Sequence, residues 1–312
     1  MSGIRVARDG GSVNDFGRLT ILGLGLIGGS LAKALKQKNA VSEVVGWGHR
    51  AQSLQKGIEL GVIDRYSLDL AEAVKDADIV VIATPTLVAE TMIEKLVPLV
   101  PATTIITDVA SVKGNLLRAA RLAFGVEPAN LVLAHPIAGS EQSGIAAAKA
   151  DLFVNHRVIV TPTEHTSSEA LERIEAMWKI TGAELSRLGV DEHDTILAAT
   201  SHLPHIAAFA LVDAFAGDPA QREIFKYAAG GFRDFTRIAS SDPIMWRDIA
   251  LANSSALLGA IDLFSEHLSQ LRTAIAAGES EKIFATFTRA KQARDQFAEL
   301  LRQRATNNLS NE

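Results

Sequence analysis

A strand-like run that leads through a glycine-rich turn into a helical pattern constrains the fold of this chain more than any other feature. Residues 19–22 form the apolar run, Gly23, Gly25 and Gly28 follow with the spacing GxGxxG, and residues 29–37 have helical periodicity. In such a turn the first glycine permits a tight bend, the second lets backbone approach a pyrophosphate, and the third lets helix and strand pack closely. The helix N-terminus then points at the phosphates. The residues expected to bind a dinucleotide here are Gly23, Gly25, Leu26, Ile27 and Gly28.

Short β-branched runs continue to alternate with helical stretches as far as residue 188. This alternation is typical of βαβ units around a parallel sheet, and uninterrupted apolar runs indicate strands that are covered on both faces. Helical patterns between the strands include residues 87–96 and 168–181. The predicted strands are residues 19–22, 43–47, 78–83, 104–108, 131–134 and 157–161, with a short one near 183–188.

From about residue 190 the strand-like runs disappear and helical spacing continues to residue 304. The predicted fold class is therefore α/β, with an N-terminal doubly wound Rossmann-type parallel sheet and an all-α C-terminal domain. We expect a flexible leader over residues 1–18, a dinucleotide-binding domain over 19–188, and a helical domain for substrate binding and dimerisation over 189–312. One apolar stripe in the last domain, a candidate dimer interface, comprises Ile249, Leu257, Leu258, Ile261, Phe264, Leu268, Leu271 and Ile275.

Composition narrows the class of protein further. The net charge of −5 argues against a nucleic-acid partner, because phosphate backbones are bound by basic surfaces. Cysteine is absent, which excludes disulfides, thiolate catalysis and cysteine-bound metals. No uninterrupted apolar run reaches the roughly 18–20 residues needed to cross a bilayer, and the polar N-terminus does not resemble a signal peptide. We therefore expect a cytoplasmic protein that binds a small-molecule substrate and has no membrane partner.

The end of the second predicted strand bears on the choice of nicotinamide cofactor. An NAD-selective site usually has an acidic residue about 20 positions beyond the glycines, where it binds the ribose hydroxyls. Gly48 stands at that position, followed by His49 and by Arg50, which can pair with a 2′-phosphate or simply lie in solvent. The segment favours NADP, or use of both NAD and NADP. Thr84 and Pro85 are expected to line the nicotinamide pocket, although a proline there can also do no more than end a strand.

Three polar clusters carry residue types suited to catalysis or substrate binding. Residues 108–114 (DVASVKG) and 135–144 (HPIAGSEQSG) each follow a predicted strand. The third cluster lies in the helical part, where 201–205 (SHLPH) is followed by GFRDFTRIA and SDPIMWRD within residues 231–248. Loops at strand ends and an arginine-bearing helical region can converge on one cleft.

Taken singly, these residues have structural explanations. A lone histidine such as His135 is more often a hydrogen-bonding core residue than a catalyst. His202 and His205 lie one helical turn apart, but without cysteine or an obvious third ligand they make a poor metal site, and no metal is expected. Arg233 and Arg237, also one turn apart, can simply lie on a helix surface. It is the combination of the three clusters that indicates a site.

In their combination and order, these motifs make the chain similar to the prephenate/arogenate (cyclohexadienyl) dehydrogenases of tyrosine biosynthesis. The resemblance extends from residue 19 to residue 248 and is carried mainly by HPIAGSEQSG and FRDFTRIASSDPIMW. It implies NAD(P)-dependent oxidative decarboxylation, which converts prephenate to 4-hydroxyphenylpyruvate or arogenate to tyrosine. Hydride leaves the ring carbon that bears the hydroxyl, the hydroxyl loses its proton, and the ring carboxylate departs as CO2. The long C-terminal helices of the family also imply a homodimer.

The resemblance further implies roles for individual residues. His135 would accept the proton of the ring hydroxyl, a task that suits an imidazole, and Ser111 would orient His135 and the nicotinamide. Arg237 would pair with a substrate carboxylate, because a guanidinium binds a carboxylate with two hydrogen bonds. The other residues expected on the substrate side are His205, His202, Glu141 and Asp234 (in an ionic network with Arg237), and Trp246 as one wall.

Two other functions are compatible with the sequence. Another two-domain Rossmann oxidoreductase, of the β-hydroxyacid dehydrogenase or imine reductase type, would also have a helical second domain. Those enzymes usually rely on a lysine in the helical domain, whereas the base expected here lies in the first domain. A non-catalytic NAD(P)-sensing protein would require the SHLPH and FRDFTRIA residues to be purely structural.

Overall fold

The computed structural model describes residues 15–139, 142–217 and 222–309. The chain divides into two compact units, residues 1–254 and 255–312. Most of the expected leader, residues 1–14, lies outside the described residues. The ordered domain nevertheless begins earlier than residue 19, because Phe16 is only 3% exposed and its backbone N–H donates to Ala40 O at 2.8 Å. An aromatic side chain just before the first strand is therefore part of the core rather than of a leader.

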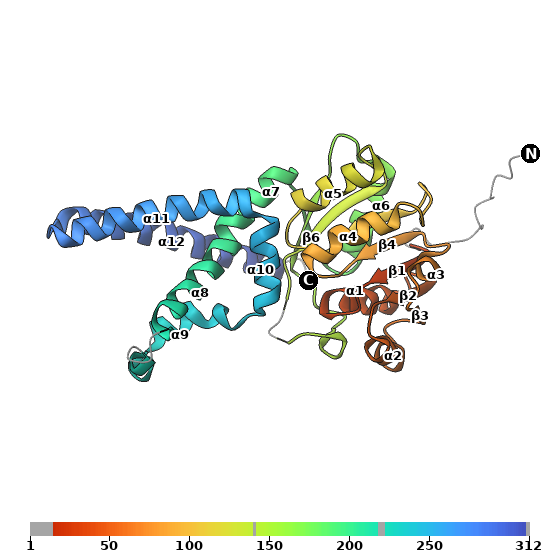
Figure 1. Cartoon of the computed structure of the whole chain (residues 1–312), viewed down its shortest axis with the longest axis horizontal. Helices are drawn as coiled ribbons and strands as arrows, with labels where there is room; N and C mark the ends of the chain where they lie inside the picture. The colour runs from red at the N-terminus through yellow and green to blue at the C-terminus, as the bar shows by residue number, and fades with distance from the viewer. Residues whose placement is uncertain (1–14, 140–141, 218–221, 310–312) are drawn as a thin grey trace, which may run out of the picture. The chain divides into compact units, whose positions relative to one another are not determined.

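The first unit contains an eight-stranded sheet with helices on both faces (Figure 1). Its strands are β1 (Arg18–Leu22), β2 (Glu43–Trp47), β3 (Arg65–Ser67), β4 (Ile79–Ile82), β5 (Ile105–Asp108), β6 (Leu131–Pro136), β7 (Arg157–Thr161) and β8 (Glu184–Arg187). The helices among them are α1 (Leu26–Gln37), α2 (Ala51–Glu59), α3 (Leu70–Val74), α4 (Thr86–Leu96), α5 (Gly114–Phe124), the 3-10 turn η1 (Ile145–Ala147) and α6 (Ser168–Ile180).

The strand order is β3-β2-β1-β4-β5-β6-β7-β8, so the chain reverses its direction across the sheet between β1 and β4. This order confirms the doubly wound Rossmann-type sheet. All neighbouring strands are parallel except β6 and β7, which pair antiparallel from Leu133–Thr161 to Pro136–Val158. The short strand β3 was not predicted, because its three residues Arg-Tyr-Ser are half-buried and carry no apolar run.

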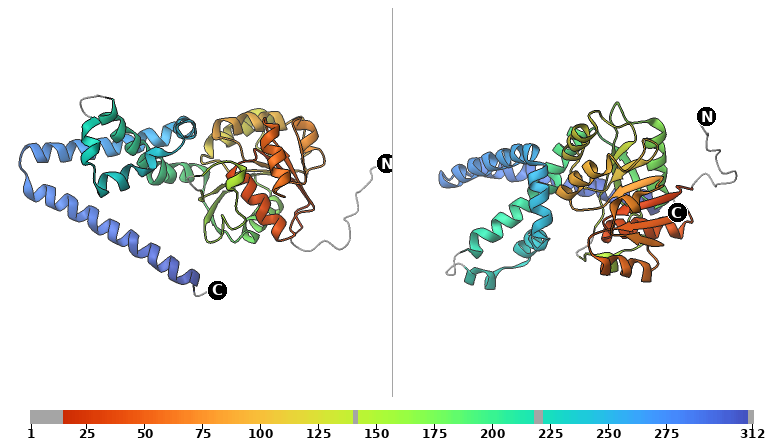
Figure 2. Two further views of the ribbon diagram at one scale, coloured as in Figure 1. Left: turned by 90° about the horizontal axis from the view of Figure 1, so that it is seen from below. Right: turned by 45° about the vertical axis from the view of Figure 1, so that its right-hand side comes forward.

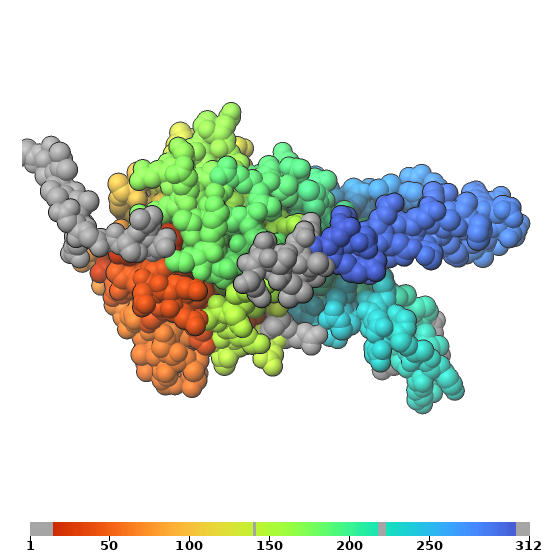
Figure 3. Space-filling view, turned by 180° about the vertical axis from the view of Figure 1, so that it is seen from behind, coloured from red at the N-terminus to blue at the C-terminus, as the bar shows by residue number. Residues whose placement is uncertain are grey.

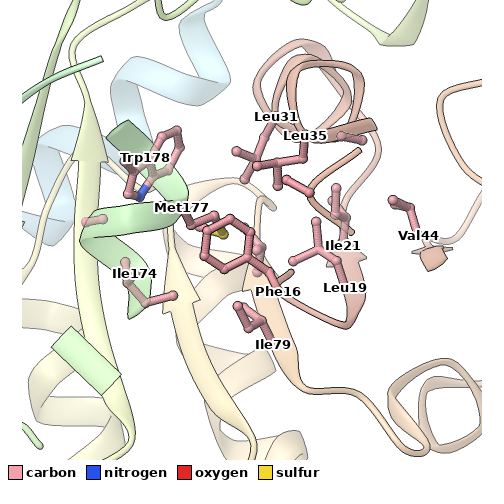
Figure 4. Close-up of a cluster of buried hydrophobic side chains, with 14 of the residues drawn as sticks. Phe16, Leu19, Ile21, Leu31, Leu35, Val44, Ile79, Ile174, Met177 and Trp178 are labelled. Carbon is pink, nitrogen blue, oxygen red and sulfur yellow. The ribbon is translucent and has the colours of Figure 1, made fainter. Parts of the chain in front are cut away.

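Alternate side chains of the central strands enter two separate cores. Leu19 and Ile21 of β1 pack with Leu31 of α1 and with Trp178 of α6, and Figure 4 shows these helices facing one another across this core. Leu22 points to the opposite face, where α3, α4 and α5 cover the sheet. Burial on both faces explains why the strands are apolar without alternation.

The segment that follows β6 returns to the first helix. Lys33 Nζ donates to Ala148 O at 2.8 Å, and Lys149 N donates to Ser30 Oγ at 2.9 Å. A Cβ on Gly29 would lie 2.4 Å from Ile145 Cδ1, so this part of α1 has close contact with η1. In the space-filling view from behind, the segment (lime) lies beside the first βαβ units (red and orange) (Figure 3).

After β8 the first unit continues as helices. They are α7 (Val190–Leu197), a π-helical turn η2 (Ala198–His202), α8 (Leu203–Ala216), η3 (Arg222–Tyr227), α9 (Gly230–Thr236), η4 (Arg237–Ser240) and α10 (Pro243–Ala252). The strands thus end at Arg187, close to the predicted domain boundary, but the compact unit extends to Ser254. The reason is that Asp194 accepts hydrogen bonds from Lys113 N and Gly114 N, and Trp246 packs with Val112 in the loop after β5.

One helical stretch, Val190–Ala216, is long and apolar enough to span a membrane when judged by length and composition alone. The prediction concerned uninterrupted apolar runs, whereas this stretch meets the criterion through its mean hydropathy. Its apolar residues are interrupted by four polar ones, His193, Asp194, His202 and His205. Those four side chains belong to a polar cluster of the first unit, so we interpret the stretch as helices that carry a site.

The second unit consists of two long helices, α11 (Ser254–Ala276) and α12 (Ser280–Leu309), which are joined by a turn at Gly278 (Figure 2). Many of their large apolar side chains are exposed in the single chain. They are Leu258, Leu263, Phe264, Leu268, Ile275, Phe284, Phe287, Phe297, Leu300 and Leu301.

Candidate active site

The glycine turn lies between the ends of β1, β2 and β4. Gly23 has a φ of 98°, a backbone conformation that favours glycine, and its N–H donates to Trp47 O at 2.9 Å. A Cβ on Gly23 would lie 2.6 Å from Ala83 O, and one on Gly28 would lie 2.8 Å from Gly23 O. The first and third glycines are therefore required by the close packing of the turn itself.

Gly25 differs from these two glycines, because a Cβ there would meet nothing within 4 Å. It precedes the first residues of α1, Leu26 and Ile27, so the helix begins three residues earlier than predicted. Nearby, at the end of β4, the Thr84 hydroxyl is buried and has no hydrogen-bond partner among the described residues. Open space at the glycine, a helix N-terminus and an unsatisfied hydroxyl at the same edge fit a bound dinucleotide.

The residues beyond β2 are accessible. His49 and Arg50 are exposed, and Arg50 is the N-cap residue of α2. The His49 ring makes an edge contact with Trp47, with 4.9 Å between ring centroids. No acidic residue occurs between Glu43 and Glu59, so this segment offers no carboxylate for ribose hydroxyls. Pro85 is exposed and precedes α4.

His135 lies at the end of β6, at the edge of the sheet where the other parallel strands also end. Its side chain is buried, and its Nδ1 lies 2.9 Å from His193 Nε2 of α7. Burial holds the pKa of His135 well below its usual value, and the neighbouring His193, Lys113 and His202 lower it further. The imidazole is therefore neutral near pH 7 and able to accept a proton.

His193 connects His135 to a carboxylate. Its Nδ1 lies 2.8 Å from Asp194 Oδ1, and an ionised carboxylate can only accept, so this nitrogen carries the hydrogen. His193 Nε2 is then the acceptor for His135 Nδ1–H. This pattern assigns the lone pair of His135 to Nε2, on the opposite side of the ring. We call the three residues Asp194, His193 and His135 the histidine relay.

Backbone N–H groups hold the carboxylate end of the histidine relay. Lys113 N donates to Asp194 Oδ1 at 2.9 Å, and Gly114 N donates to Oδ2 at 2.8 Å, so the carboxylate lies at the N-terminus of α5. Burial tends to raise the pKa of Asp194, but the hydrogen bonds from His193, Lys113 and Gly114 outweigh it and the pKa is lowered. Asp194 is therefore ionised.

His202 is buried and oriented by an amide. Asn253 Nδ2 lies 3.1 Å from His202 Nδ1 and also donates to Asp194 O at 2.8 Å. Because an amide nitrogen can only donate, His202 Nδ1 is the acceptor, and the hydrogen of neutral His202 lies on Nε2. Burial lowers the pKa of His202 to about 4. Within the described part of the chain, His202 Nε2 has no hydrogen-bond partner.

His205 stacks on Trp246, with 3.5 Å between ring centroids and 18° between ring planes. Its Nδ1 donates to Ser201 O at 2.9 Å. Burial lowers the pKa of His205, although the bond to Ser201 opposes this, and the positive charge of Arg237 lowers it further. Arg237, the first residue of η4, is exposed yet close enough to His205 to influence it.

The structure thus brings His135, His202, His205 and Trp246 into one connected group, as the edge contact between the His202 and Trp246 rings also shows. Ser111 lies half-buried in the loop between β5 and α5. Asp234 is exposed and pairs with Arg233, with 3.1 Å between Arg233 Nε and the carboxylate. Glu141, expected in an ionic network with Arg237, lies outside the described residues.

His193, Asp194 and Asn253 were not predicted as site residues, and Asp108 and Lys113 were included only as members of the 108–114 cluster, without roles of their own. The signal for His193 and Asp194 was present, because both are polar and interrupt an apolar helical stretch that needs an explanation for them. Asn253 carried no such signal, because it follows the end of an ordinary amphipathic helix. The described residues contain no group of three or more His, Cys, Asp or Glu side chains arranged to hold a metal ion.

A doubly wound sheet with a glycine cradle, and a neutral buried histidine at the same edge, define a nicotinamide-dependent dehydrogenase. Matches to known protein families narrow this class of dehydrogenase further. The prephenate dehydrogenase nucleotide-binding domain matches residues 31–187, and the prephenate dehydrogenase dimerization domain matches residues 190–289. This chain belongs to the prephenate dehydrogenase family.

Individual relatives agree with this assignment. The cyclohexadienyl dehydrogenase of Zymomonas mobilis is 34% identical over 89% of this chain and 95% of its own length. A crystal structure of Aquifex aeolicus prephenate dehydrogenase with hydroxyphenyl propionate and NAD+ has a TM-score of 0.83, 34% identity, and coverage of 90% of this chain and 98% of that one. Synechocystis arogenate dehydrogenase has a TM-score of 0.77 and 30% identity, with 90% and 99% coverage.

Proposed function

We propose that this chain catalyses the NAD(P)-dependent oxidative decarboxylation of prephenate, of arogenate, or of both, in tyrosine biosynthesis. The observation that carries the proposal is His135, a buried neutral imidazole whose partner His193 leaves its Nε2 available as a base. Relatives named for prephenate, cyclohexadienyl and arogenate substrates support the substrate class.

The chemistry needs one base near the ring hydroxyl. A bound nicotinamide dinucleotide supplies the hydride acceptor. As hydride leaves the ring carbon that bears the hydroxyl, His135 Nε2 takes the hydroxyl proton, and the electrons of the ring–carboxylate bond enter the ring as CO2 departs. The oxygen is then a phenolate, and His135 returns the proton to it. The ring becomes a phenol, and aromatisation drives the reaction. The positive charge that forms on His135 is shared with His193 and stabilised by Asp194.

The substrate side is proposed from the helices after β8. Arg237 binds a carboxylate of the substrate, and His205 and Trp246 form a stacked wall beside it. His202 presents a buried N–H with no acceptor in the described part of the chain, which suits a polar group of the substrate. Ser111 orients His135 and the nicotinamide.

Two further substrate-side residues complete the proposal. Glu141 and Asp234 are assigned to an ionic network with Arg237 that closes the cleft. In the described structure the Asp234 carboxylate pairs with Arg233, so Asp234 would have to exchange this exposed partner in order to join the network. An exposed pair of this kind contributes little free energy and is easily exchanged.

For the cofactor we propose NADP, or use of both NADP and NAD. The support is the acid-free segment after β2, with the exposed His49 and Arg50 at the start of α2. Replacing Arg50 with alanine should raise KM for NADP about tenfold, the effect of losing roughly 1.4 kcal/mol, while KM for NAD changes little. Lys56→Ala, on the same helix, is the control. A strong preference of the native protein for NAD would contradict this part of the proposal.

We also propose a cytoplasmic homodimer formed through the helices of residues 190–309. Support comes from the matched dimerization domain and from the exposed apolar side chains of α11 and α12, which are unusual on the surface of a monomer. Light scattering should give twice the mass of the 33.3 kDa chain. A monomeric mass at micromolar concentration would overturn the dimer.

The test of the activity is direct. Purified protein is mixed with prephenate or arogenate and with NAD or NADP, and the absorbance of the reduced nicotinamide is followed while products are separated by chromatography. We expect one molecule of reduced cofactor for each molecule of product. The product is 4-hydroxyphenylpyruvate from prephenate or tyrosine from arogenate. Absence of cofactor reduction with all four combinations would refute the proposed function.

A further inference from the structure

We infer that the buried ion pair of Asp108 and Lys113 is a positioning device for His135, which fixes the backbone that carries the base and places a positive charge beside the base. This inference rests on the function proposed above, in which His135 accepts a proton. Asp108 is the last residue of β5, and Lys113 immediately precedes α5. Both side chains are fully buried and in direct contact.

The pair holds the peptide groups on both sides of Ala134, the residue before His135. Lys113 Nζ donates to Ala134 O at 2.8 Å, and Ala134 N donates to Asp108 Oδ1 at 3.1 Å. The strand pairing of β5 with β6 ends at Thr107–Val132, two residues earlier. Side chains therefore continue the attachment where the backbone ladder has stopped, next to the proposed base.

Lys113 also reaches the other end of the histidine relay. Its backbone N–H donates to Asp194 Oδ1 at 2.9 Å, whereas its ammonium group holds Ala134 O. One residue thus contacts the backbone beside His135 and the carboxylate that orients His193. The same turn carries Ser111, and Ala110 N donates to Asp108 Oδ2 at 2.8 Å inside it.

The pair is ionised. Burial raises the pKa of Asp108 and lowers that of Lys113, while each residue opposes the shift of the other. Every hydrogen bond to the Asp108 carboxylate comes from an N–H donor, on Ala110, Ala134 or Lys113, and such donors favour the charged form. The ammonium of Lys113 consequently contributes a positive charge beside His135.

Stability alone is a weak explanation for such a pair. Taking two charges out of water is costly, and well-packed apolar residues of similar volume are often as stable as a buried ion pair. An influence on the protonation of His135 explains why two charged residues are buried at this position. The titratable groups that face His135 are His193 of α7, Lys113 before α5 and His202 of η2, and all three disfavour its protonation.

The test compares two double variants in which both charges are removed together. Asp108→Asn with Lys113→Met loses the charge and the bond to Ala134 O, whereas Asp108→Asn with Lys113→Gln keeps an amide donor near that carbonyl. The His135 pKa is measured by NMR on protein with labelled histidines, assigned with His135→Asn. We expect the pKa of His135 to rise in both variants by up to roughly one pH unit, because Lys113 lowers this pKa and acts on His135 more strongly than Asp108 does.

In turnover, the acid limb of the kcat/KM profile should move to higher pH by the same amount, and the methionine variant should lose about tenfold more kcat than the glutamine variant. The control is Glu175→Gln with Arg187→Met, which removes an ion pair between α6 and β8 and should leave the His135 pKa and the profile unchanged. If the methionine variant does not fold, the His135 pKa of the glutamine variant decides whether the pair acts on His135.

An unchanged His135 pKa in a folded double variant would overturn the inference, as would an equal change in the Glu175/Arg187 control. The NMR titration needs no substrate. If the native protein turned over neither prephenate nor arogenate, the proposed function would fail, while the titration would still show whether the pair acts on His135.

Discussion

The cofactor cradle and the histidine relay belong to the same edge of the sheet, but they are built in different ways. The cradle is backbone from one short stretch, residues 23–28, where the absence of side chains creates the space. The relay is made of side chains from β6 and α7, and it is supported by residues before α5 and after α10. A local motif therefore specifies the first, whereas only the folded chain assembles the second.

This difference predicts which properties of the protein a substitution in each region should change. Changes in the relay should affect chemistry, protonation and stability together, because its members share buried hydrogen bonds. A substitution at Gly25, where an added Cβ would meet nothing, should affect the binding of the cofactor and little else.

The largest effect is expected at the base. His135→Asn should reduce kcat about 10²–10⁴-fold, the usual contribution of general acid–base catalysis, with a much smaller change in KM. Steady-state kinetics against both substrates measure this. The exposed His165, replaced in the same way, serves as the control. Near-native turnover of His135→Asn would show that another group is the base.

A second effect is loss of stability in acid. The unfolded chain binds a proton at histidine near pH 6.5, whereas folded His202 does so only near about 4. Between pH 6.5 and 4 the unfolded chain therefore binds a proton that the folded chain does not, and acid favours unfolding. The free energy of unfolding should fall by up to about 3 kcal/mol as pH drops from 6.5 to 4. His135 and His193, whose pKa values are also lowered, act in the same direction.

Urea unfolding at a series of pH values measures this loss. His202→Gln retains an acceptor for Asn253 and should reduce the dependence on pH without abolishing it. Stability of the native protein that stayed constant from pH 6.5 to 4 would contradict buried neutral histidines.

A third effect concerns the orientation of the base. His193→Gln and Asp194→Asn should each lower kcat about 10- to 100-fold, the range found where an outer partner orients an imidazole. Because the residues act as one chain of hydrogen bonds, the double variant should lose less than the product of the single losses. Additive losses would mean that the two residues do not act through a common partner.

The smallest effect is expected in the cradle. Gly25→Ala places a methyl group in open space, so the midpoint of thermal unfolding should stay the same while KM for the cofactor rises about tenfold. Gly28→Ala is the matched comparison, since its methyl group would lie 2.8 Å from Gly23 O and should lower the melting temperature. An equal loss of stability in both variants would remove the distinction between the two glycines.

The same contrast explains what the sequence could predict. The central strands were predictable because their side chains are buried on both faces, and the glycine turn because its spacing follows from the geometry of one ligand. His135 could be proposed because it follows a strand in a recognisable motif. His193 and Asp194 could be noticed as polar residues in an apolar helix, but their role could not be predicted. It depends on contact between α7 and the start of α5, about 80 positions apart in the chain.

The antiparallel pairing of β7 and the short β3 were missed for related reasons. Strand direction depends on how the chain returns after β6, which the residues of β7 do not encode, and the three residues of β3 contain too little pattern to detect. Phe16 was assigned to a leader because its neighbours are polar and contain glycine, although its own side chain enters the core.

The π-helical turn Ala198–His202 has a consequence for the evolution of this region. A wide turn of this kind adds a residue without adding a full turn, so it sets the angular phase between Asp194 on one side and His205 on the other. If the same number of residues formed ordinary helix here, the later histidine would rotate by about 100°, whereas a chain one residue shorter would form ordinary helix and keep the phase. Ala199 and Thr200 are exposed, so their identity matters little to this geometry, which depends on the width of the turn.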